Sequence, residues 1–294
     1  MRVRLLHRDG AGDGTPLAAG AETLVQDLEL EIVLRAMADG DDFLLEVARR
    51  GVLASLEEPE AIHYRQEVFA DCLRHPDLVR DLYSLASTAV HGEREILRGF
   101  GDYPDAVLRR AVERLELFGR SLRRLRAIAD ARGASVRSEG LSTFFERIGG
   151  ELDDKWFESF DRHLEDLRFR HGVTFSAALG PGNQGTAHLL HRTVPRGIGW
   201  WTRLRLSDED GFTIEVDGRS ETATRQLAEL RERGVALVAD VGAQSADHVS
   251  DFLQELRAEI GFYLGGVNLR EQLASRGVPV SRPAPHPSSA SGLA

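Results

Sequence analysis

Cysteine and lysine are almost missing from this chain: Cys72 and Lys155 are the only residues of their kinds. A single cysteine excludes an internal disulfide framework and a cysteine-based zinc site, and it favours a cytoplasmic protein. No apolar run reaches the length of about eighteen residues that a membrane-spanning helix needs. The N-terminal stretch also lacks the apolar core of a secretory signal. We therefore expect no membrane association.

The lysine that a phosphate-binding loop requires is missing as well. Residues 180–186 read Gly-Pro-Gly-Asn-Gln-Gly-Thr, which has the Gly-x-x-x-x-Gly spacing of such a loop. Thr186 replaces the lysine that would reach the β- and γ-phosphates, and Ala187 follows it. A tight turn is the better interpretation. We expect no nucleotide hydrolysis, and no ATP, magnesium or other cofactor bound by these residues.

Charge is unevenly distributed along the chain. The formal net charge of −10 argues against a general nucleic-acid coat protein, because phosphate binding needs clustered positive charge. Residues 24–82 carry fourteen acids and six arginines, whereas residues 98–137 carry ten arginines and five acids. Arginine suits bidentate phosphate contacts. The alternative is that these arginines simply solvate helix faces.

Helical periodicity dominates the chain. Between residues 106 and 131 the apolar positions step by threes and fours, after a proline suited to a first turn and before Gly133 as a stop. A second long helix is predicted over residues 245–275, with Gly277 and a following proline at its end. Its internal glycines each cost about 1 kcal/mol relative to alanine, which predicts close packing against neighbouring helices.

Two short segments, 172–179 and 212–216, alternate in the manner of β-strands. The predicted fold class is thus mainly α, an elongated bundle of long lever-like helices with a small antiparallel β insertion. We divide the chain into a short strand and loop, an N-terminal helical core, helices with the β insertion, a C-terminal lever helix and a disordered Pro/Ser/Ala-rich tail. These segments are 1–23, 24–150, 151–243, 244–279 and 280–294.

Candidate chemical groups are sparse. His188 and His191 have no third ligand at metal-binding spacing, so a metal site is not expected. Asp247 and His248 could form an acid–base pair. The favoured alternative is a helix N-terminus capped by Ser245, with Asp247 in the first turn. No catalytic residue is predicted.

Aromatic residues offer a second set of candidates. Phe144 and Phe145 are expected in the core, with Glu146 solvated. Trp200 and Trp201 lie among arginines, and aromatic rings among arginines can stack on bases of nucleic acid; one of them could instead anchor its loop. The candidate nucleic-acid-binding residues are Arg120, Arg123, Arg124, Arg196, Trp200, Trp201 and Arg203.

Several short sequences together resemble a known family. They include Ile62-His63-Tyr64-Arg65-Gln66, which follows the acidic segment 57–60, and further segments at 103–104, 138–140, 151–154, 180–186 and 244–248. The chain resembles the helical core of MutS-type DNA mismatch-repair ATPases, specifically the short bacterial members. The resemblance extends to about Pro285.

This resemblance implies a function in coupling. In that family, long helices connect a DNA-embracing clamp to an ABC-type ATPase, and dimerisation closes the ring. The chain is therefore expected to be a non-catalytic core and lever region of a MutS-like DNA repair protein, a homodimer that binds DNA weakly and in a salt-sensitive way. ATP and magnesium would enter only through an ATPase domain outside these residues. The alternative is a helical protein–protein interaction scaffold without DNA or nucleotide activity.

Overall fold

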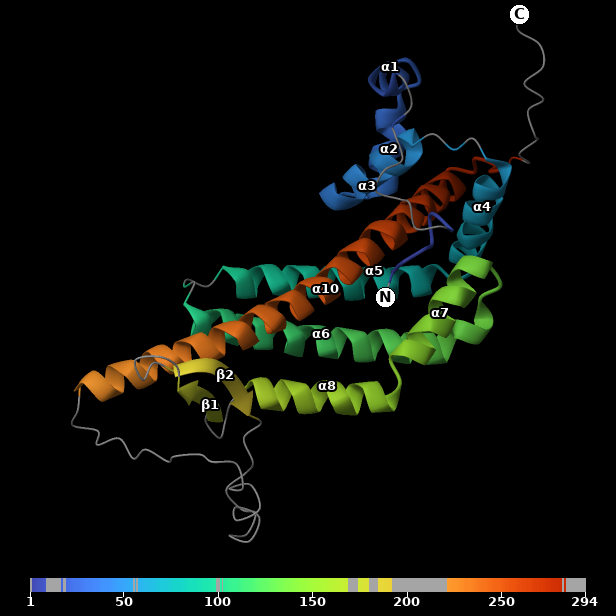
Figure 1. Ribbon diagram of the computed structural model, residues 1–294. Helices are drawn as coiled ribbons and strands as arrows, with labels where there is room; N and C mark the ends of the chain where they lie inside the picture. Colours follow the sequence, from blue (N-terminus) through green and yellow to red (C-terminus); the bar gives the residue numbers. More distant parts are fainter. Residues whose placement is uncertain are drawn as a thin grey trace, which may run out of the picture. The chain divides into compact units, whose positions relative to one another are not determined.

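A computed structural model shows a mainly helical protein (Figure 1). The structure describes residues 2–8, 17, 20–54, 56, 58–98, 101, 103–168, 174–179, 185–191, 221–281 and 283. The helices, in chain order, are α1 (Ala21–Asp27), α2 (Leu30–Ala38), α3 (Asp42–Leu53), α4 (Pro59–Arg74), α5 (Pro76–Leu97), α6 (Pro104–Arg132), the short 3₁₀ helix η2 (Gly133–Ser135), α7 (Glu139–Glu151), α8 (Asp154–Leu167) and α10 (Glu221–Ser275).

The chain divides into two compact units. The first comprises residues 1–93, 118–156 and 249–294, and the second comprises residues 94–117 and 157–248. The first unit contains α1 to α4, most of α5, the C-terminal part of α6, α7 and the C-terminal part of α10. Its core includes Leu34, Leu82, Leu122, Leu256 and Tyr263, all at most 1% exposed.

Local sequence signals explain where several helices begin. Asp41 caps α3, accepting hydrogen bonds at Oδ1 from the main-chain N–H groups of Phe43 at 2.8 Å and Leu44 at 3.2 Å. Pro59 and Pro76 occupy the first positions of α4 and α5, where the missing N–H of proline costs nothing. These residues determine where α3, α4 and α5 begin, and so where the short connections before these helices end.

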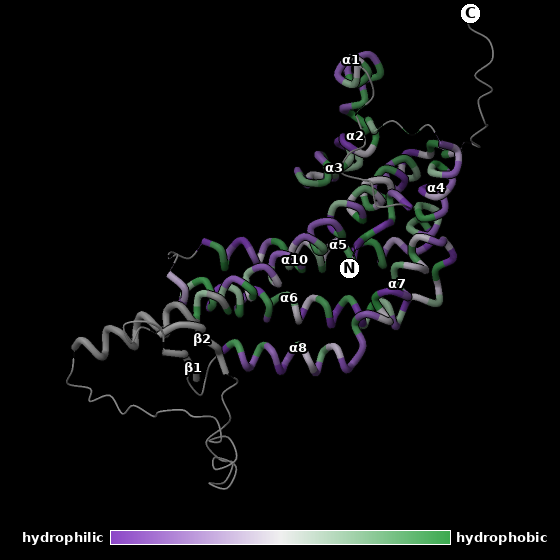
Figure 2. The backbone as a smooth tube through the Cα atoms, in the orientation of Figure 1, coloured by the Kyte–Doolittle hydropathy of each residue, from purple (hydrophilic) through white to green (hydrophobic). Residues whose placement is uncertain are grey.

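The prediction of a long helix over residues 106–131 is confirmed. Helix α6 begins at Pro104 and ends at Arg132, immediately before Gly133. The predicted apolar positions are buried, among them Leu115, Phe118 and Leu122. Figure 2 shows hydrophobic and hydrophilic residues alternating along this helix, as one buried and one solvated face require.

The second predicted long helix is correct at its end and wrong at its start. Helix α10 ends at Ser275, and Gly277 follows with a φ of 71°. The main-chain N–H of Val278 donates to the carbonyl of Leu273 at 3.0 Å, which closes the helix end. The helix begins at Glu221 instead of Ser245. Ser245 is an interior residue whose Oγ donates to the carbonyl of Val241 at 2.8 Å.

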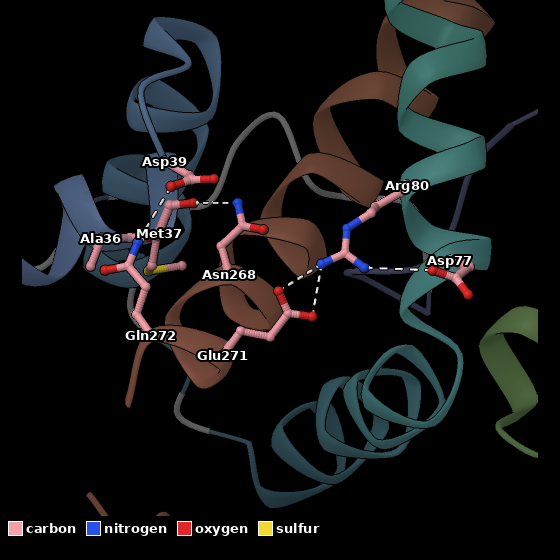
Figure 3. A network of polar contacts seen from close by, with 8 residues as sticks. All are labelled: Ala36, Met37, Asp39, Asp77, Arg80, Asn268, Glu271 and Gln272. Carbon is pink, nitrogen blue, oxygen red and sulfur yellow. Dashed lines mark hydrogen bonds and ion pairs between the residues drawn. The ribbon is translucent and has the colours of Figure 1, made fainter. Parts of the chain in front are cut away.

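Close packing at the glycines of α10 is confirmed. A Cβ atom at Gly261 would lie 3.1 Å from Leu44, and one at Gly265 would lie 3.3 Å from Met37. At Gly266 it would lie only 2.5 Å from the Phe69 ring. The glycines therefore bring α10 close to α2, α3 and α4. Polar side chains continue this contact, since Asn268 and Gln272 donate to the carbonyls of Met37 and Ala36 at 3.0 and 3.1 Å (Figure 3).

Two strands are described, β1 (Thr174–Leu179) and β2 (Gly185–His191). They pair antiparallel, with Thr174 opposite His191 and Leu179 opposite Gly185. The segment 212–216, predicted as a strand, lies outside the described residues, as do residues 180–184 of the predicted turn and residues 284–294 of the tail.

Candidate nucleic-acid interface

Three of the candidate arginines share an exposed face of α6. Arg120, Arg123 and Arg124 are all exposed, and residues three and four apart lie on one side of a helix. The opposite face is fixed in the core of the first unit by Phe118, Leu122 and Leu125, each 0% exposed. The buried face therefore determines which way the arginines point. We call Arg120, Arg123 and Arg124 the α6 arginine cluster.

Other arginines of the basic segment have structural roles. Arg126 is half-buried, and its Nη1 donates to the carbonyls of Gly149 at 2.9 Å and Leu152 at 2.8 Å. Its Nε also pairs with Asp130 at 2.8 Å. Arg126 thus satisfies carbonyls at the end of α7, where a helix leaves acceptors without partners. Arg126 is therefore neither a solvated charge nor part of the exposed arginine face, and its structural role was not predicted.

Arg114, in the second unit, is also used structurally. It is 7% exposed, and its Nη2 donates to Asp247 Oδ1 at 2.7 Å. This ion pair overturns both interpretations of Asp247. The residue lies in the interior of α10, so it is not in a first turn, and it pairs with arginine instead of with His248. His248 is exposed on the same helix.

The remaining candidates lie outside the described residues. Arg196, Trp200, Trp201 and Arg203 belong to the segment 192–220, so the structure does not bring them together with the α6 arginine cluster or separate them from it. Elsewhere, Phe144 and Phe145 are buried with ring centroids 5.5 Å apart, and Glu146 is exposed, as predicted.

The described ranges offer little for other kinds of site. Within them, no group of three or more His, Cys, Asp and Glu side chains is placed to hold a metal ion. None of the described helices combines the length and the apolar character needed to cross a bilayer. The Cys72 thiol is buried, and burial raises its pKa far above the ordinary value, which makes it a poor nucleophile.

Sequence reasoning missed a buried polar site in the first unit. Glu255, Glu259 and Tyr263 of α10, with Tyr64 and Arg65 of α4, hold the main chain of residues 3–6. The spacing of 255, 259 and 263 by fours placed these three on one helix face. The pattern alone did not reveal that their partner lies about 250 residues earlier in the chain.

Comparison with known proteins defines the class as MutS-like. The chain matches the MutS2 N-terminal domain over residues 57–276. This protein belongs to the MutS2 N-terminal domain family. The resemblance to MutS-type mismatch-repair ATPases is thereby narrowed to the MutS2 branch and to its N-terminal region.

A second similarity is short. Maturation protein A of Pseudomonas phage PP7 is 32% identical over 112 residues, which are 35% of this chain and 24% of that protein. The chain therefore spans about a quarter of that protein's length. No solved structure matches the chain.

Proposed function

We propose that this chain is a non-catalytic core of a MutS2-like protein that engages DNA and couples this engagement, through its long helices, to an ATPase domain outside these residues. The observation that carries the proposal is the α6 arginine cluster. It projects from a 29-residue helix whose other face is fixed in a core. A rigid helix that binds DNA at one point along its length is suited to transmit the effect of that binding to a distant domain.

The energetics of the cluster favour an anionic partner. Like charges three or four residues apart destabilise a helix by about 0.2–0.5 kcal/mol per pair. Arginine binds phosphate through two parallel hydrogen bonds, and these contacts would offset the repulsion between Arg120 and Arg124. The net charge of −10 limits the affinity, so binding is weak and salt-sensitive. We further propose a homodimer, as in related ATPases, and no ATP turnover by this chain alone.

The test is DNA affinity as a function of salt. Each phosphate contact contributes about −0.9 to the slope of log K against log salt, so three contacts weaken binding about 40-fold between roughly 50 and 200 mM. The triple variant Arg120→Gln, Arg123→Gln, Arg124→Gln should flatten the slope by up to about 3.

A matched control carries the same change of net charge elsewhere. Arg35, Arg50 and Arg276 are exposed and lie outside α6, so changing all three to glutamine should leave the slope within about 1 of the wild type. If both triple variants gave the same slope of log K against log salt, the proposed interface would be wrong.

A protein-binding scaffold remains the second candidate, because the first unit has an apolar cavity of about 470 Å³. It is lined mainly by aliphatic and aromatic side chains of α2, α3, α4 and α10, including Val33, Met37, Ile62, Phe69, Phe262 and Leu273. Apolar contacts are indifferent to moderate salt. A chain that shows no salt-dependent DNA binding would favour this alternative.

A further inference from the structure

The N-terminal residues 2–8 are held in place without belonging to a helix or strand. Val3 and Leu5 are nevertheless both 0% exposed. Figure 1 shows this dark-blue segment beside α4 and the C-terminal part of α10. We call its partners Tyr64 and Arg65 of α4, with Glu255, Glu259 and Tyr263 of α10, the N-terminal docking site.

Two carboxylates of α10 accept the main-chain donors of this segment. Glu255 Oε2 accepts from the N–H of Val3 at 3.0 Å. Glu259 Oε2 accepts from the N–H groups of Leu5 at 2.5 Å and Leu6 at 3.1 Å. Strand pairing normally satisfies such donors, and here side chains replace the neighbouring strand.

Three side chains of the same site donate to the main-chain acceptors. Tyr64 Oη donates to the carbonyl of Arg4 at 2.5 Å, and Tyr263 Oη donates to that of Leu5 at 2.6 Å. Arg65 Nε donates to the carbonyl of Leu6 at 2.8 Å. Six main-chain groups of residues 3–6 are thus bound by five side chains.

This arrangement has the two parts of a peptide-recognition site. Bonds to the main chain give affinity for any extended peptide, and burial of alternate side chains gives selectivity. Val3 and Leu5 are the buried alternate residues. Further along, Arg65 Nη2 lies 2.7 Å from His7 Nε2 in a partly buried contact, and Arg8 forms an exposed ion pair with Glu139 at 2.8 Å, which contributes little.

We propose that the N-terminal docking site binds an extended peptide with apolar side chains two residues apart, and that the chain's own residues 2–8 fill it as a detachable clasp. The occupant is this segment of the same chain. Among the described residues, side-chain bonds and the burial of Val3 and Leu5 are the contacts that hold this segment, so it can leave while α4 and α10 remain packed.

Glu259 makes the docking sensitive to pH. Burial raises the pKa of Glu259 to about 7, and the nearby Glu255 adds to the increase, whereas Arg65 and the N–H groups of Leu5 and Leu6 lower it. The other titratable or charged groups around the site are Tyr64, Tyr263, His7, Arg4, Arg8, Glu139 and Cys72. Among them, burial and the nearby Arg65 lower the pKa of His7.

The direction of the effect follows from hydration. When the clasp leaves, water reaches Glu259 and its pKa returns toward the ordinary value of 4.5. The docked state then holds the proton more tightly, so docking weakens as pH rises from 4.5 through about 7. The docking equilibrium constant should fall about tenfold between pH 6 and pH 8.

Hydrogen exchange on the full chain tests the clasp. Protection of the fragment with residues 1–8, corrected for the intrinsic pH dependence of exchange, should fall about tenfold from pH 6 to pH 8 in the wild type. Glu259→Gln cannot ionise and keeps an amide oxygen as acceptor, so its protection should be equal at both pH values. The fragment 252–264 of α10 must stay protected throughout, which shows an intact fold. Equal wild-type protection at both pH values would overturn the pH sensitivity of docking, and protection of residues 1–8 as strong as that of 252–264 would overturn the clasp.

A labelled peptide with the sequence of residues 2–8 tests the site in trans. Because the peptide replaces the clasp and meets the same Glu259, the pH dependence of its own binding offsets that of clasp release, so its apparent affinity should change little between pH 6 and pH 8. The matched control is the same peptide N-methylated at the residues equivalent to Leu5 and Leu6, which removes both donors to Glu259. Absence of binding by the first peptide, or equal binding by both, would overturn the proposal.

Discussion

The Asp71 carboxylate accepts a hydrogen bond from the main-chain N–H of Ser138 at 2.5 Å, and this contact attaches the start of α7 to α4. The same oxygen accepts from the N–H of Arg137 at 2.8 Å, and Arg74 pairs with the other oxygen at 2.8 Å. Burial acts to raise the pKa of Asp71, but the hydrogen bonds from Ser138 and Arg137 and the charge of Arg74 outweigh it and lower the pKa.

Replacing Asp71 should therefore destabilise the fold. Asp71→Ala leaves the buried N–H of Ser138 and the partly buried N–H of Arg137 without an acceptor. A buried unpaired N–H costs about 1–3 kcal/mol, so we expect a loss of about 3 kcal/mol in the free energy of unfolding. Asp71→Asn keeps one acceptor and should lose less. Urea unfolding measures both. Asp81→Ala, at an exposed position of α5, is the control and should change stability by less than about 0.5 kcal/mol.

Low pH should remove the stabilisation that Asp71 gives to the folded protein. Because its pKa is lowered in the folded state, its stabilisation is present above the ordinary value of 3.8 and is lost as pH falls through the folded pKa. The difference in unfolding free energy between the wild type and Asp71→Ala should therefore shrink below about pH 4. A difference that stays constant from pH 6 to pH 3 would show that Asp71 acts only by filling space.

A glycine-to-alanine substitution should have opposite effects on stability at a tightly packed site of α10 and at an open site of α7. Gly266→Ala gains helix propensity but places its Cβ atom 2.5 Å from the Phe69 ring, and such overpacking costs about 1–3 kcal/mol. Gly150→Ala in α7 meets no atom within 4 Å and should stabilise by up to about 1 kcal/mol. Thermal unfolding compares the two. A stabilising Gly266→Ala would contradict the close approach of α10 to α4.

The arginines of α6 should separate into structural and solvated residues. Arg126→Gln removes the donors to Gly149 and Leu152 and should cost about 1–2 kcal/mol. Arg124→Gln, at an exposed position two residues earlier, should change stability by less than about 0.5 kcal/mol. Denaturant unfolding at one salt concentration measures both. Equal costs would mean that the carbonyls of α7 do not depend on Arg126.

The spacing of apolar residues correctly predicted the features of the fold that depend on local sequence, such as the buried and exposed faces of a helix. The buried face of α6 followed from apolar residues three and four apart, and with it the exposure of Arg120, Arg123 and Arg124. The start of α10 did not follow, because the helix continues through Gly242, which local propensity disfavours. A Cβ atom at Gly242 would lie 3.4 Å from Ala111, so α10 packs at this point against a residue more than a hundred positions away in the sequence.

The docking of residues 2–8 could not be predicted for the same reason. Its hydrogen bonds join residues separated by 58 to 258 positions, and no periodicity relates them. Arg65 reads in sequence as one charge on an amphipathic helix, yet it is 8% exposed and bonded to the carbonyl of Leu6. The sequence pattern predicted helical structure for the segments that build the site. That residues 2–8 dock against them depends on the tertiary fold and could not be predicted from the pattern.

The raised pKa of Glu259 makes a prediction for global stability. A carboxyl that is neutral when folded destabilises the native state progressively as pH rises from 4.5 through about 7. Glu259→Gln removes this ionisation while keeping shape and acceptor, so relative to the wild type it should gain up to about 3 kcal/mol in unfolding free energy between pH 5 and pH 8. Urea unfolding at both pH values measures the gain, with Glu146→Gln, at an exposed position of α7, as the control. A difference between wild type and Glu259→Gln that does not change with pH would mean that Glu259 is ionised in the folded protein across this range, and that its bonds to Leu5 and Leu6 are those of a carboxylate.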